Sequence, residues 1–118
     1  MIPAMTLQRL QQRVAQIKAE LLALGPMHPG SISAQYNVCG TLGCRCKDPK
    51  KPAKHGPYGH LSYTWRGKGA TRFVRPERLA VLREKIARYR RFRELTDEWV
   101  DVAIALEALE RGTAQPEP

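Results

Sequence analysis

The sequence predicts an α+β fold in which two helices flank a small antiparallel β region. Apolar residues recur at heptad spacing near both ends of the 118-residue chain, which indicates two long helices. Between them, residues 31–38 and 58–74 alternate apolar and polar side chains, as half-buried strands do. We therefore expect a single domain: a helix over residues 1–25, a cysteine-rich β head over 31–75, a helix over 76–112 and a disordered tail over 113–118.

The N-terminal helix is predicted from a narrow apolar stripe. Thr6 suits the N-cap, and Gly25-Pro26 suits the end, because glycine favours the position after a helix and proline cannot continue one. Such a narrow stripe needs a helical partner to cover it. Its members are Leu7, Leu10, Val14, Ile17, Leu21 and Leu24.

The C-terminal helix is predicted to begin at Pro76, with Glu77 in its first turn. Its apolar stripe consists of Leu79, Leu82, Ile86, Tyr89, Phe92, Leu95, Trp99, Val102, Leu106 and Leu109. The two stripes together predict a coiled-coil-like stalk, formed within one chain or across a homodimer, with Trp99 as a seam residue.

The β head is predicted as one strand followed by a hairpin. Residues 31–38 form the strand, and residues 58–74 form the hairpin, turning at residues 66–69. We expect Tyr63, Trp65 and Phe73 to form a small core under the hairpin, although Tyr63 or Trp65 could instead stack on an unpaired base. His28, in the linker over residues 26–30, is expected to be solvated rather than a ligand.

All three cysteines fall within eight residues, and a histidine follows them. Thiolates and an imidazole suit tetrahedral zinc, so we predict a structural zinc ion bound by Cys39, Cys44, Cys46 and His55. Two alternatives stay open: ordinary reduced thiols, or a redox or nucleophilic cysteine activated by Arg45. The odd cysteine count and the lack of a signal peptide favour a reducing cytoplasm.

Positive charge is concentrated in the β head. The chain has a formal net charge of +9. Residues 31–75 contain nine Lys or Arg residues and one acidic residue, whereas residues 94–118 contain one Arg and seven acidic residues. This asymmetry predicts contact with a polyanion through one region, and we expect nucleic acid, DNA rather than RNA. The predicted contacts are Lys47, Lys50, Lys51, Lys54, Arg66, Lys68, Arg72, Arg75, Arg90 and Arg91.

The central sequence resembles an uncharacterised family of small bacterial proteins with the signature CGKxGCRC…HGPYxxLSYxxxGKxxxRxV. The resemblance covers about residues 30–100, and Cys39, Cys44, Cys46 and His55-Gly56-Pro57-Tyr58 match the signature. Such proteins look associated with transposases and other mobile-element genes. The resemblance therefore implies a nucleic-acid context, with a transposase or recombinase as a possible partner, but no reaction.

These observations favour a non-enzymatic, cytoplasmic, dimeric accessory protein that binds nucleic acid. The head contains one carboxylate, Asp48, and no paired acids for phosphodiester chemistry, so we predict no enzyme. No apolar run is long enough to span a membrane. The alternative is an assembly subunit of a transposase, recombinase or ribonucleoprotein complex, docking through its helical seam.

Overall fold

The computed structural model describes residues 4–37, 45, 49 and 55–112. The elements are helix α1 (Ala4–Ala23), strands β1 (Ser31–Asn37), β2 (His55–Trp65) and β3 (Lys68–Val74), and helix α2 (Pro76–Glu110). They divide into two compact units: a helical unit of residues 1–26 and 88–118, and a sheet unit of residues 27–87. The α+β class and the antiparallel arrangement of the strands are as the sequence predicts.

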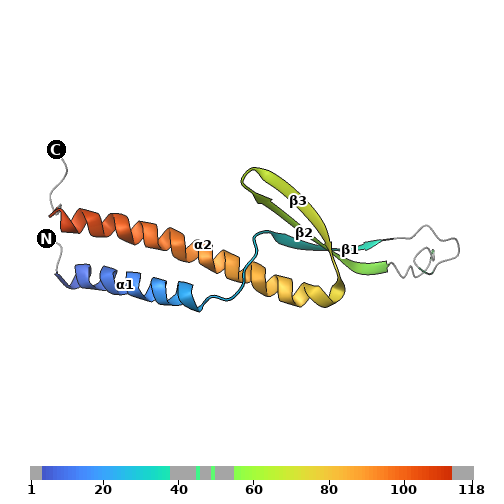
Figure 1. The fold of residues 1–118 in the computed structure, drawn as a ribbon, viewed down its shortest axis with the longest axis horizontal. Helices are drawn as coiled ribbons and strands as arrows, with labels where there is room; N and C mark the ends of the chain where they lie inside the picture. Colours follow the sequence, from blue (N-terminus) through green and yellow to red (C-terminus); the bar gives the residue numbers. More distant parts are fainter. Residues whose placement is uncertain (1–3, 38–44, 46–48, 50–54, 113–118) are drawn as a thin grey trace. The chain divides into compact units, whose positions relative to one another are not determined.

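In the helical unit, α1 and the C-terminal part of α2 run antiparallel, side by side (Figure 1). The apolar stripes predicted for both helices are the sides that this pairing covers. Ile17 on α1 and Leu95 on α2 are completely buried, and Val102 is buried. The remaining stripe residues of this unit are half-buried. The seam is therefore covered within a single chain.

Two ion pairs join α1 to α2. Arg13 donates from Nε and Nη2 to the carboxylate of Glu98, with 2.6 Å between Nη2 and Oε1. Arg91 donates in the same two-pronged way to Glu20, with 2.9 Å between Nη2 and Oε1, and a third bond from Nη1 reaches Glu94. Planar guanidinium–carboxylate pairs fix geometry, so these contacts favour the antiparallel register.

The ends of α1 differ slightly from the prediction. The helix begins at Ala4, so Thr6 is inside it and the predicted N-cap is wrong. The helix ends at Ala23, close to Gly25-Pro26 as predicted. The Arg88 side chain donates to the Pro26 carbonyl oxygen at 3.1 Å, which fixes the chain as it leaves α1.

In the sheet unit, three strands form an antiparallel meander in the order β1-β2-β3. Ile32 pairs with Leu61, and Leu61 pairs with Arg72, so these three residues share one face. The first turns of α2 pack on that inner face, where Leu61, Val74, Leu79 and Ile86 form a buried cluster. Gly59 sits under Leu79, and a side chain at position 59 would collide with the leucine.

The predicted core of the head is wrong in two of its three aromatic residues. Tyr63 packs against the buried cluster, but Trp65 and Phe73 are 53 % and 57 % exposed. Trp65 is on the inner face at the end of β2, beyond the buried cluster, and Phe73 is on the opposite face from Val74. Aliphatic side chains from α2 fill the core instead.

His28 is half-buried, so the prediction that it is solvated is wrong. Its ring meets Tyr63 edge-on, with 4.8 Å between the centroids, and Nδ1 is 2.6 Å from the Pro29 carbonyl oxygen. Its backbone N–H also donates to the Lys85 carbonyl oxygen at 3.1 Å. His28 therefore joins the linker to both the sheet and α2 inside the sheet unit.

We expect Ile17→Ala to destabilise the protein by about 2–5 kcal/mol, because it leaves a cavity in the helical seam. Leu22→Ala is the matched control: Leu22 is on the same helix but 88 % exposed, so its loss should change stability by less than about 0.5 kcal/mol. Urea unfolding followed by circular dichroism measures both. Equal stability losses in the two variants would contradict the assigned seam.

Acid should weaken the helical pairing. The hydrogen bonds from Arg13 and Arg91 hold the pKa values of the Glu98 and Glu20 carboxyls below their ordinary values. Stabilisation from a depressed carboxyl pKa is present above the unfolded pKa and disappears as the pH falls through the folded one.

We therefore expect the melting temperature to fall more between about pH 5 and pH 3 in the wild type than in a Glu20→Gln/Glu98→Gln variant. A variant of two exposed carboxylates on α2, Asp101→Asn/Glu110→Gln, should follow the wild type. Parallel melting curves for all three proteins would show that the ion pairs contribute no pH-dependent stability.

Candidate nucleic-acid interface

The β2–β3 hairpin presents four cations and no carboxylate. The strands are joined by a two-residue turn, Arg66-Gly67, rather than by the four-residue turn predicted. Residues 55–75 contain no Asp or Glu. The four cationic side chains are all exposed and are Arg66 in the turn, Lys68 and Arg72 on β3, and Arg75 between β3 and α2.

Arg66 occupies a conformation that its side chain disfavours. Its φ is +53°, and that of Gly67 is +78°, as in the type I′ turns that suit the twist of a hairpin. Glycine, asparagine and aspartate adopt this region readily, whereas other L-residues pay about 1 kcal/mol or more for it. The hairpin thus carries a positive charge where an uncharged turn residue would fold better.

An exposed indole lies beside this charge. The Arg66 guanidinium carbon is 5.9 Å from the centroid of the Trp65 ring, within the range of a cation–π contact. Lys68, a second cation, pairs with Trp65 across the strands. Cations next to an aromatic ring suit phosphates and bases together.

Arg90 and Arg91, predicted from the sequence to bind nucleic acid with these cations, belong to the helical unit. Arg90 is exposed, but Arg91 binds Glu20 and Glu94. The Arg91 charge is therefore already neutralised by protein carboxylates, and the residue has a structural role in the antiparallel pair.

The remaining predicted site residues lie outside the described part of the chain. These are Cys39, Cys44, Cys46, Lys47, Lys50, Lys51 and Lys54. His55 begins β2, where it pairs with Asn37 of β1. Among residues 4–37 and 55–112, no group of three His, Cys, Asp or Glu residues could hold a metal ion.

A second aromatic group, which was not predicted from the sequence, lies on the outer face of the sheet. Phe73 has Tyr58 and His60 as ring neighbours, each with 6.3 Å between centroids. Strand alternation could have predicted this position, because side chains of a strand point to opposite faces in turn. Phe73 lies between Arg72 and Val74, which both belong to the inner face, so Phe73 belongs to the outer face.

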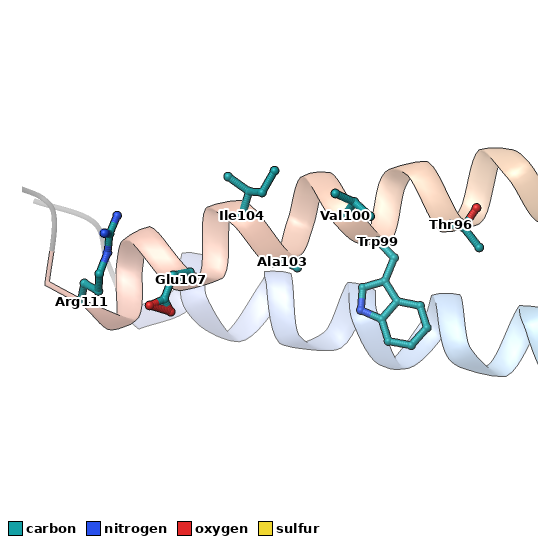
Figure 2. A pocket seen from close by; sticks show the side chains of 7 residues that line it. All are labelled: Thr96, Trp99, Val100, Ala103, Ile104, Glu107 and Arg111. Carbon is teal, nitrogen blue, oxygen red and sulfur yellow. The ribbon is translucent and has the colours of Figure 1, made fainter. Parts of the chain in front are cut away.

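A shallow apolar groove runs along α2 in the helical unit. Figure 2 shows Val100 and Ile104 on the side of α2 turned away from α1, while Trp99 points toward α1. Val100 and Ile104 are 58 % and 66 % exposed. Trp99 is half-buried, and the Lys18 ammonium lies 5.5 Å from its centroid, as expected for a seam residue.

Comparison with known families assigns this chain. Residues 7–84 match the family described as Domain of unknown function (DUF6788). The chain is a member of the DUF6788 family. The match begins on α1, includes the whole sheet and ends in the first turns of α2, so the family spans parts of both units. The comparisons with curated proteins and with solved structures gave no match.

The DUF6788 assignment agrees with the resemblance to an uncharacterised family that the central sequence shows. No helix in the described part of this DUF6788 protein is long and apolar enough to cross a lipid bilayer.

Proposed function

We propose that this protein is a non-enzymatic accessory protein that binds nucleic acid, principally DNA, through its β2–β3 hairpin. The observation that carries the proposal is Arg66: an exposed cation in a strained left-handed conformation, at the tip of a hairpin with three further cations and no carboxylate. Strain kept at an exposed position suggests a functional side chain. Phosphates are the ligands that such a concentration of positive charge suits best.

The segment over residues 47–54 adds four lysines to the same region of the sequence. With about half of eight head cations neutralising phosphates, the logarithm of the binding constant on duplex DNA should fall with the logarithm of salt concentration at a slope of roughly −3 to −4. The resemblance to mobile-element proteins supports a transposase or recombinase as the setting in which such binding is used.

We expect Arg66→Asn/Arg72→Gln to weaken binding and to reduce the magnitude of the salt slope by about 1.5, because each lost phosphate contact removes about 0.7–0.9. Arg66→Asn alone should also raise stability by about 1 kcal/mol, since asparagine suits the turn. Fluorescence anisotropy with a labelled duplex, titrated at several salt concentrations, measures affinity and slope.

The matched control is Arg9→Gln/Arg93→Gln, which removes the same charge from exposed positions of α1 and α2. This control should keep the wild-type slope. If both double variants lose affinity and slope equally, net charge rather than the hairpin is responsible. If the wild type shifts no probe at any salt concentration, the nucleic-acid proposal fails.

We also propose that zinc stabilises the head through Cys39, Cys44, Cys46 and His55. The donor set supports it, since three thiolates and an imidazole complete a tetrahedral site. The pairing of Asn37 with His55 supports it further, because that pairing brings together the two ends of the segment that carries the cysteines. The ion would supply stability and no chemistry.

Elemental analysis of protein purified without added metal should find about one zinc per chain, and Cys44→Ser should lose it together with thermal stability. His55→Gln should also lose zinc, whereas His60→Gln, on the same strand, should keep it. Folded wild-type protein without metal would refute the zinc site and leave the cysteines as ordinary or redox-active thiols.

A second candidate function is that of an assembly subunit. The exposed pair Val100 and Ile104 favours it, because the groove there could receive an apolar partner surface. The seam itself is covered by the pairing of α1 with α2, so a partner or a homodimer would use this groove instead. Salt-independent binding to a protein, with no shift of a nucleic-acid probe, would select this function.

A further inference from the structure

The outer face of the sheet, opposite the buried cluster, carries side chains that the core does not use. Pairing across the three strands places Ser33, His60 and Phe73 in one row and Ser62 beside Thr71 in the next. We define the outer face by six side chains: Ser33, Tyr58, His60, Ser62, Thr71 and Phe73. It combines three aromatic rings with three aliphatic hydroxyl groups and has no charged member.

Phe73 is the unusual member of this face. More than half of its surface is exposed, although phenylalanine is among the residues most often buried. The rings of Tyr58 and His60, both on the neighbouring strand β2, are each 6.3 Å away between centroids. An exposed ring beside two half-buried ones is typical of an interaction surface, because it leaves apolar area in water that a ligand can cover.

Charge decides which ligand this face suits. The hairpin that forms most of it has no carboxylate and four cations: Lys68 and Arg72 belong to the inner face, whereas Arg66 is in the turn and Arg75 follows β3. A second copy packed on the same face would bring like charges together, whereas a polyanion would be attracted. Nucleic acid is the polyanion that also has flat apolar faces to stack on phenylalanine and tyrosine.

The ring spacing distinguishes a single strand from a duplex. Bases in a duplex cover one another at about 3.4 Å per nucleotide, so their faces are not available to protein rings. The ring centroids of Tyr58 and Phe73 are 6.3 Å apart and the rings are tilted, a spacing that suits bases separated from one another in an unpaired strand. Ser62 and Thr71, with 3.4 Å between their hydroxyl oxygens, can donate to or accept from base edges or sugars.

We propose that the outer face binds single-stranded nucleic acid, with neighbouring unpaired bases stacked on Phe73 and Tyr58. This inference rests on the proposed function and names its substrate class. Arg66 in the turn and Arg75 after β3 hold the phosphates, and the outer face holds the bases. The protein therefore prefers single strands or opened duplexes to intact duplex.

The test measures the affinity of the full-length protein for a labelled twelve-nucleotide oligothymidine and for a duplex of the same length. Phe73→Val keeps a strand-forming residue but removes the ring, and it should weaken single-strand binding about 5- to 100-fold. Duplex affinity and the salt slope should stay unchanged, because no phosphate contact is lost. Tyr58→Val should act in the same direction, and Phe73→Trp should retain or strengthen binding.

Trp65→Val is the matched control, since Trp65 is about as exposed as Phe73 but belongs to the inner face. It should leave the preference for single strands intact. Loss of that preference in Trp65→Val but not in Phe73→Val overturns the inference and moves stacking to the hairpin tip. The inference is also overturned if the wild type binds both probes equally and only Arg66→Asn/Arg72→Gln reduces the affinity. That result would still support the proposed function.

Two further outcomes decide against the outer face. A smaller particle mass for Phe73→Val by light scattering, with oligothymidine affinity retained, assigns the face to a second copy of the chain. Failure of the wild type to bind either probe overturns the inference together with the proposed function. Melting temperatures of all variants show whether a loss of binding arises from unfolding. Phe73→Trp keeps an aromatic ring at position 73, so its affinity for oligothymidine tests stacking independently of the Phe73→Val variant.

Discussion

The apolar stripe along α2 is the constraint on which both units depend. Its first part, with Leu79 and Ile86, covers the inner face of a sheet that could not bury one face alone, and its later part, with Leu95 and Val102, covers α1. A helix such as α1 is marginal in isolation, so it also needs this partner. One continuous helix thus supplies apolar area to two separate small cores.

Among the described residues, α2 packs on one face of the sheet only, and Phe73 on the other face and Arg66 at the hairpin tip are exposed. In the head, aliphatic residues of the sheet and of α2 fill the core, and Trp65 and Phe73 remain at the surface. The turn residue Arg66 accepts an unfavourable backbone conformation. Exposed rings and a strained cation both reduce stability, so the requirements of folding explain neither.

Periodicity along the chain predicted the helices and strands well, because local hydrogen bonding and side-chain alternation depend on neighbouring residues. The stripe from Leu7 to Leu24 and that from Leu79 to Leu109 are the covered sides of the two helices. The error came from assuming that large aromatic residues fill the core. Strand register decides which face of the sheet Phe73 occupies, and the length of sheet that α2 covers decides whether Trp65 is buried. Neither the register nor this coverage can be read from the amino-acid composition.

The sequence by itself determined the α+β class, the extents of the elements to within a few residues, the concentration of cations in the hairpin and membership of the DUF6788 family. These follow from local patterns and from residue identity. Only the tertiary structure decided that α1 pairs with α2 of the same chain, that Arg91 is neutralised by Glu20, and that Tyr58, His60 and Phe73 gather on an exposed face. Each of these joins residues distant in sequence, because packing between elements is set by which surfaces the whole chain can bury together.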